Sequence, residues 1–200
     1  MKIVLIGSTG TIGKAVVEAL SCNHDVVKVG NCGGDYQVDI SSTESIKKLY
    51  DSVGNFDAVV SAAGLAKFGA LAELKDEDYS LGLNNKLMGQ VNLVRMGLDH
   101  INDNGSFTLT SGLLASEPMP GSAAISTVNA GLNGFTRAAA LEMPRAIRIN
   151  VVSPIWVTET MKKSGMDTAG GMSAKDTARA YVESVEGSRN GEVLDVRDFA

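Results

Sequence analysis

Three glycines near the amino terminus have the spacing of a phosphate-binding turn. The segment GSTGTIG places glycines at positions 7, 10 and 13, between an apolar run and a stretch of helical periodicity. Gly7 permits a tight turn, Gly10 lets the backbone approach a diphosphate, and Gly13 lets the following helix pack close to the sheet. The free N–H groups of that helix would then face the phosphates. The predicted dinucleotide-binding turn consists of Gly7, Ser8, Thr9, Gly10, Thr11, Ile12 and Gly13.

The end of the second predicted strand bears on which dinucleotide fits. An acidic residue there would bind the ribose 2′-hydroxyl of NAD and repel the 2′-phosphate of NADP. The sequence has Gly30 and Asn31 at this point, and Asp35 comes late. The lack of an acid favours NADP, and the lack of an arginine leaves NAD possible.

Apolar runs alternate with stretches of helical periodicity along the whole chain. The apolar runs predict strands over 2–7, 25–30, 36–40, 56–64, 105–112, 147–154 and 191–196. The helical spacing predicts helices over 11–21, 41–53, 76–101, 122–143 and 173–185. This alternation predicts an α/β fold of the Rossmann type, with a doubly wound, mostly parallel seven-stranded sheet and helices on both faces. We expect residues 1–200 to form a single domain, with a short irregular lid over about 158–172.

The composition argues against several classes of protein. A net charge of −5 does not favour nucleic acid or anionic membrane surfaces as partners. Cys22 and Cys32 are too few for a disulfide framework and are expected to be buried small residues, and the isolated His24 and His100 give no metal site. No run of about 18 apolar residues is present, and MKIVLIG is too short for a signal peptide. We therefore expect a cytoplasmic protein.

The order of motifs resembles that of the short-chain dehydrogenase/reductase family over nearly the whole length. After the glycine turn, VDI at 38–40, SAAG at 61–64, TLTSG at 108–112 and RINVVSP at 148–154 are similar to successive segments of the family. Ser61 and Ala62 replace two asparagines, Ile155 replaces a glycine, and the chain is some fifty residues shorter than typical members, mostly in the lid. The further cofactor contacts that the resemblance implies are Asn31, Asp39, Ile40, Ala62, Ala63, Gly64, Pro154 and Val157.

The catalytic residues that the resemblance implies are only partly present. Typical members use serine, tyrosine, lysine and asparagine, with the tyrosine and lysine four residues apart on one helix. Ser111 occupies the serine position, but Ile125 and Asn129 stand where tyrosine and lysine are expected. Lys86 stands in KLMG where the family's asparagine usually lies. The sequence therefore exchanges the lysine and the asparagine between two helices, and we identify an atypical compact member that lacks the Tyr-x-x-x-Lys pair.

Three explanations of this exchange stay open. The catalytic set has been lost and Lys86 is a solvated helix residue, or Lys86 compensates by reaching back to the ribose or to Asn129. In the second case a lysine whose pKa is lowered by burial can itself donate the proton. In the third, a tyrosine outside the motif serves, namely Tyr50, Tyr79 or Tyr181, although none of them has a lysine four residues on. We expect Ser111, Lys86 and Asn129 to converge beside the nicotinamide pocket.

The function that follows is hydride transfer between NADP, or NAD, and a small carbonyl or alcohol. A non-catalytic NADP(H)-binding sensor or partner protein of the same fold is the alternative, and a scaffold that binds no cofactor is a third reading. Trp156 either lines the substrate pocket or simply packs, and the methionines at 161, 166 and 172 either line an adaptable apolar pocket or have no such role. By resemblance, the long helix and the helix that follows it pair between subunits, so the resemblance implies a homodimer or homotetramer.

Overall fold

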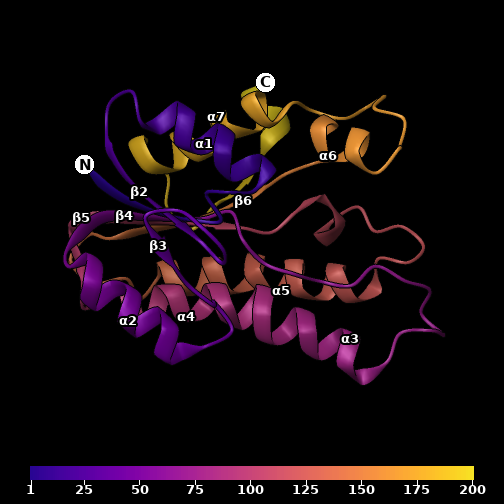
Figure 1. The fold of residues 1–200 in the computed structure, drawn as a ribbon, viewed down its shortest axis with the longest axis horizontal. Helices are drawn as coiled ribbons and strands as arrows, with labels where there is room; N and C mark the ends of the chain where they lie inside the picture. The colour runs from indigo at the N-terminus through magenta and orange to yellow at the C-terminus, as the bar shows by residue number, and fades with distance from the viewer.

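A computed structural model describes residues 1–200 as one seven-stranded sheet between two layers of helices (Figure 1). The strand order is β3-β2-β1-β4-β5-β6-β7, and every neighbouring pair is parallel. The predicted Rossmann-type sheet is therefore confirmed, and it is parallel throughout. The strands are β1 (Lys2–Ile6), β2 (Asp25–Gly30), β3 (Tyr36–Gln37), β4 (Phe56–Ser61), β5 (Ile101–Thr110), β6 (Arg148–Ser153) and β7 (Val193–Asp195).

Helices cover both faces of the sheet. Helices α1 and α7 lie on one face, and α2, α4 and α5 lie on the other (Figure 1). Each face has its own apolar cluster, so the central strands are buried on both sides, as their continuous apolar sequences require. The α-helices are α1 (Thr11–Leu20), α2 (Thr43–Val53), α3 (Asp76–Leu81), α4 (Met88–Gly97), α5 (Ala123–Ala140), α6 (Thr158–Lys163) and α7 (Ala174–Glu186). Short 3₁₀ turns occupy Leu113–Ala115 and Val196–Phe199.

The helix predicted over 76–101 is broken into three parts. Between α3 and α4, residues Gly82–Leu87 form a π-helix, in which the backbone N–H of Met88 donates to the carbonyl of Leu83 five residues earlier. The helical stretch ends at Gly97, and β5 begins at Ile101, four residues before the predicted start. Apolar periodicity does not distinguish the π-helix, because one extra residue in a turn leaves the pattern on either side intact.

Three further expectations are wrong in part. The segment 158–172 is not irregular throughout, because Thr158–Lys163 form α6 and a bridge pairs Val157 with Met172. The strand expected over 36–40 stops at Gln37. Cys22 and Cys32 are exposed rather than buried, since each lies in a turn beyond the end of an element. No helix is both long enough and apolar enough to cross a bilayer.

Two helix glycines lead to opposite predictions for stability. An added Cβ at Gly13 would lie 2.0 Å from the carbonyl oxygen of Gly7, whereas one at Gly134 in α5 meets nothing within 4 Å. Gly13→Ala should therefore destabilise the fold by about 1–3 kcal/mol through overpacking. Gly134→Ala should stabilise it by roughly 0.5–1 kcal/mol, because alanine loses less backbone entropy in a helix. Urea unfolding of both variants measures the two effects, and equal values would contradict the close packing at Gly13.

Candidate active site

The glycine turn joins β1 to α1 in a closely packed arrangement. Gly7 has a φ of +84°, and a Cβ there would lie 2.5 Å from the carbonyl oxygen of Ala62. The backbone N–H groups of Gly7 and Ser8 both donate to the carbonyl of Val29, at 2.9 and 3.1 Å. No side chain caps the N-terminus of α1, which follows at Thr11. Its first N–H groups are therefore free to bind an anionic ligand.

The short helix α6 brings a cation to this turn. The Nζ of Lys163 lies 3.4 Å from the Oγ1 of Thr11, the first residue of α1. The turn GSTGTIG itself contains no charged side chain. Lys163 is thus a basic group within reach of phosphates bound at the turn.

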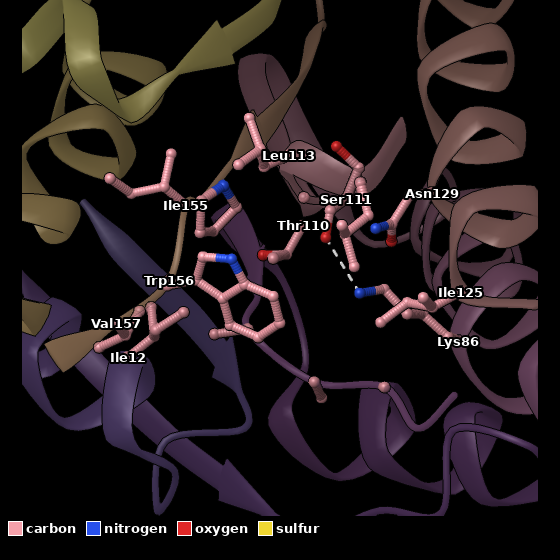
Figure 2. Close-up of a pocket in the computed structure, with 16 residues that line it drawn as sticks. Ile12, Lys86, Thr110, Ser111, Leu113, Ile125, Asn129, Ile155, Trp156 and Val157 are labelled. Atoms are coloured by element: carbon pink, nitrogen blue, oxygen red, sulfur yellow. Dashed lines mark hydrogen bonds between the residues drawn. The ribbon is translucent and has the colours of Figure 1, made fainter. Parts of the chain in front are cut away.

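A cavity of about 260 Å³ lies beside the glycine turn, at the carboxyl ends of the central strands. Its walls come from the start of α1, the segment after β4, the ends of β5 and β6, the π-helix and α5. Figure 2 shows the indole of Trp156 across the cavity from Lys86, Ile125 and Asn129. In open α/β sheets this edge is where ligands bind.

Lys86 extends from the π-helix into this cavity. Its side chain is partly buried, and its Nζ donates to the backbone carbonyl of Ser111 at 3.0 Å (Figure 2). Desolvation lowers the pKa of Lys86 from 10.5 to about 8. Lys86 therefore does not extend into bulk solvent, as the first explanation expected, but loss of the catalytic set is not tested by its position. A lysine with this pKa holds and releases a proton near neutral pH.

Two neighbouring residues fix the position of Lys86. The Nε2 of Gln90 in α4 donates to the carbonyl oxygens of Lys86 and Thr110, at 3.3 and 2.9 Å, and its Oε1 accepts from the N–H of Thr110 at 2.8 Å. Gly64 packs against the lysine stem, since a Cβ at Gly64 would lie 2.7 Å from the Cγ of Lys86. The π-helix, a feature frequent at functional sites, is thus tied to the end of β5.

Asn129 lies in the same cavity with unused hydrogen-bonding capacity. It is only 2% exposed, and its Oδ1 has no hydrogen-bond partner in the protein. Buried polar groups are nearly always paired, so this amide is suited to a ligand that donates a hydrogen bond. Rotation about the Cβ–Cγ bond can place either the oxygen or the nitrogen toward the cavity.

Ser111 meets Lys86 through its backbone rather than its side chain. Its hydroxyl makes a long 3.5 Å contact to the carbonyl of Val152. Ser111, Lys86 and Asn129 all line the cavity, so the structure brings the three predicted catalytic residues together. Lys86 has no hydrogen bond to Asn129, and its partner is the Ser111 carbonyl instead.

The three tyrosines considered as substitutes do not line the cavity. Tyr50 and Tyr181 are fully buried, and burial raises the pKa of each phenol. The hydroxyl of Tyr181 lies 2.7 Å from the Oγ1 of Thr110, which does line the cavity. No tyrosine is therefore placed to reach a substrate directly.

Apart from the glycine turn itself, where the buried Ser8 donates its hydroxyl to the carbonyl of Val29 at 3.0 Å, the predicted cofactor residues and Ile12 fall into three groups. Ile12, Ala62, Ala63, Gly64, Pro154 and Val157 line the cavity. Asn31 is exposed just beyond β2, near the turn. Asp39 is exposed, and its Oδ1 accepts from the N–H and hydroxyl of Ser41, while Ile40 is buried against Gly89. Ile40 does not line the cavity and packs against the start of α4.

Sequence reasoning missed several residues of the cavity. Thr110 ends β5, and Gly112, Leu113 and Leu114 line the cavity just beyond it. Their place at the carboxyl end of a central parallel strand was the available signal. Trp156, for which both lining and plain packing were open, lines the cavity and is 37% exposed, whereas Met161, Met166 and Met172 do not line it.

The residues present fit a nicotinamide dinucleotide. The turn at Gly7 has no room for a side chain, and the uncapped start of α1 suits phosphate groups. The unpaired amide oxygen of Asn129 suits a ribose hydroxyl. Together, the parallel sheet, the glycine turn and the cavity define a dinucleotide-binding protein of the Rossmann class.

Comparison with known proteins agrees with this class. Residues 8–196 match the family described as enoyl-(acyl carrier protein) reductase. The chain is 28% identical to a hydroxynaphthalene reductase of Aspergillus fumigatus over 186 residues, which cover 87% of this chain and 66% of that protein. The crystal structure of the protein lin1944 from Listeria innocua is 44% identical, with a TM-score of 0.94 and coverage of 98% of this chain and 99% of that chain.

A third match is the crystal structure of a small-chain dehydrogenase in complex with NADPH. It is 26% identical, has a TM-score of 0.86, and covers 98% of this chain and 95% of that chain. The chain belongs to the short-chain dehydrogenase/reductase family, a family of NAD(P)-dependent oxidoreductases. It spans just under two thirds of the Aspergillus reductase but nearly all of the Listeria protein.

The desolvation of Lys86 predicts that the free energy of unfolding of the wild type depends on pH. Below pH 8 the lysine is charged in both the folded and the unfolded chain, so folding carries the full cost of partly burying that charge. Between about pH 8 and 10.5 the folded chain has lost the proton while the unfolded chain keeps it, so the stability of the wild type rises with pH.

Lys86→Met should therefore stabilise the fold at pH 7, by on the order of 2 kcal/mol. This advantage should shrink as the pH is raised through that window. Urea unfolding at pH 7 and pH 10 measures the difference between the two proteins. The exposed Lys47 of α2 supplies the control Lys47→Met, which should show neither effect. A Lys86→Met stability difference that does not vary with pH would contradict the assigned desolvation.

Proposed function

We propose that the protein is an NADP(H)-dependent oxidoreductase that interconverts a small carbonyl compound and its alcohol, with Lys86 as the proton donor. The observation that carries the proposal is the position of the Lys86 Nζ in the cavity, 3.0 Å from the Ser111 carbonyl. A lysine whose pKa is near 8 takes over the task that a tyrosine and a lysine share in typical members.

The proposed roles follow from the position of each residue. The backbone of the glycine turn and the start of α1 hold the diphosphate, and Asn129 accepts a hydrogen bond from the nicotinamide ribose. When bound, the reduced nicotinamide supplies the hydride. Lys86 donates a proton from Nζ to the substrate oxygen as that oxygen gains negative charge, and the neutral amine regains its proton from water. The Ser111 carbonyl and Gln90 position Lys86 for this step.

The preference for NADP is supported by two observations. Directly beyond β2 the chain presents Asn31 rather than an acid, and the nearby Asp35 carboxylate accepts from the backbone N–H of Lys28 at 2.9 Å. A related small-chain dehydrogenase has been crystallised with NADPH. We also propose a cytoplasmic location, a single domain over 1–200, and a homodimer or homotetramer, as the family resemblance implies.

Turnover and its pH dependence test the role of Lys86. A screen of aldehydes, ketones and quinones with NADPH and NADH, followed at the absorbance of the reduced cofactor, should find a reduced substrate. Reduction needs the ammonium form of Lys86, so kcat/KM for reduction should fall above pH about 8. Oxidation of the product alcohol needs the neutral amine and should rise through the same pH range.

Variants of Lys86 sharpen this test. Lys86→Met should lower kcat by roughly 10²–10⁴-fold, the usual effect of losing general-acid help. Lys86→Arg keeps the charge but cannot release a proton near neutral pH, so its remaining activity should lose the pH dependence. Tyr181→Phe, which removes the phenol beside Thr110, serves as the control and should stay within a few-fold of wild type. Tight NADPH binding without any turnover would favour a sensor instead, and no binding of either cofactor would indicate a scaffold.

Lys163 provides a separate test of the diphosphate site. Its Nζ lies beside Thr11, so Lys163→Ala should raise the Kd for NADPH roughly fivefold, the value of one exposed charge contact of about 1 kcal/mol. The loss should diminish at high salt, because exposed charge pairs are screened. Lys162→Ala, one residue earlier in α6, is the matched control. Equal Kd values for Lys163→Ala and Lys162→Ala would show that α6 does not contact the phosphates.

A further inference from the structure

Lys86 is the single ionisable side chain among the 16 residues that line the cavity. Nine of these residues are hydrophobic, and Leu113, Leu114, Ile125 and Trp156 form much of the wall away from the glycine turn. The ammonium therefore faces an apolar chamber with no carboxylate in it. Charges buried among apolar groups are normally paired, so the cavity lacks a partner for this cation.

The elements packed around the π-helix do not supply that partner. The only charged residues of α4 and α5 are Arg95 and Arg137, each near the C-terminal end of its helix. The acids of α3 occupy its first turn and do not line the cavity. In the loop after β5, Glu117 pairs with Arg197 at 2.8 Å. The acids of β4 and β5 lie toward the amino ends of these strands, away from the cavity; they are Asp57 and Asp103.

The ammonium of Lys86 also has N–H groups that make no hydrogen bond within the protein. It carries three N–H groups, and one of them is directed to the carbonyl oxygen of Ser111. Two remain for a ligand. A small molecule that carries a carbonyl oxygen and a nearby carboxylate oxygen could accept both of these N–H groups, and its negative charge would complement the positive charge of the ammonium.

We propose that the substrate is an oxo-carboxylate with an apolar body, whose carboxylate pairs with the Lys86 ammonium while its carbonyl oxygen accepts the second free N–H. The apolar body packs against Ile125, Leu113, Leu114 and Trp156. Ile125 keeps this part of the wall apolar, whereas a tyrosine at the same position would introduce a hydroxyl group. The inference rests on the proposed function, since it names the substrate class of the same site.

Trp156 makes binding measurable without turnover. It is the single tryptophan of the chain and it lines the cavity, so its fluorescence reports what enters. The probes are cyclohexanecarboxylate and cyclohexanecarboxamide, which share a body and differ in charge. Each is titrated into the full chain, with and without NADP⁺. The carboxylate should bind at least tenfold more tightly than the amide at pH 7, and this advantage should decline as the pH rises above about 8.

Variants test whether the tighter binding of the carboxylate depends on Lys86. Lys86→Met should abolish the advantage of the carboxylate, and Lys47→Met, which removes a charge outside the cavity, should keep it. Lys86→Gln replaces Lys86→Met if the latter does not fold. Equal affinities for the two probes in the wild type would overturn the inference, and so would a carboxylate advantage that survives in the Lys86 variants.

Turnover separates this inference from the proposed function. An oxo-carboxylate should be reduced with a lower KM than its methyl ester, which lacks the charge. Preference for the ester would overturn the substrate class and leave the proposed function standing. Carboxylate binding without reduction of any carbonyl would contradict the proposed function while upholding an anion site at Lys86.

Discussion

The site depends on one contact, the hydrogen bond from the Lys86 ammonium to the Ser111 carbonyl. It holds a cation inside a chamber that contains no acid, and the surrounding structure makes this arrangement possible. Gln90 ties the π-helix to the end of β5, and Gly64 leaves room for the lysine stem. The desolvation that makes the charged form costly also lowers the pKa of Lys86 to about 8, which suits the proton transfer proposed above. Stability and reactivity are therefore opposed at this residue.

By the family resemblance, lysine and asparagine are exchanged between two helices and Ile125 stands in place of a tyrosine, so both the composition and the geometry of the site differ from those of typical members. Lys86 places a cation on the π-helix, and Asn129 places an amide on α5, where the resemblance implies a lysine. With Ile125 in place of the phenol, the wall beside α5 becomes apolar. In the proposed function this cation has no second group to activate, because Lys86 itself holds the proton.

Much of the fold could be predicted from periodicity and turn chemistry. The apolar runs correctly predicted seven strands, and the helical spacing over 41–53 predicted α2, which starts two residues later at Thr43, where the Ser42 hydroxyl accepts from the Ser45 N–H at 3.2 Å. Other features escaped because they arise from contacts distant in sequence. The π-helix is held by Gln90 against β5, and α6 packs beside the glycine turn through Lys163. Cys22 and Cys32 were misplaced because residue type alone does not reveal that a turn lies at the surface.

The sequence by itself determined the family, the parallel sheet and the place of the glycine turn, because these depend on local patterns: glycines at fixed offsets, apolar runs and helical spacing. Only the tertiary structure decided whether Lys86 points to solvent or into the cavity, and which atom of Ser111 it meets. The burial of a charge and the pKa that results are set by residues from at least four separate segments that converge at the carboxyl ends of the strands. No spacing along one segment of the chain encodes that convergence. The environment of Lys86 could therefore be inferred only from the tertiary structure.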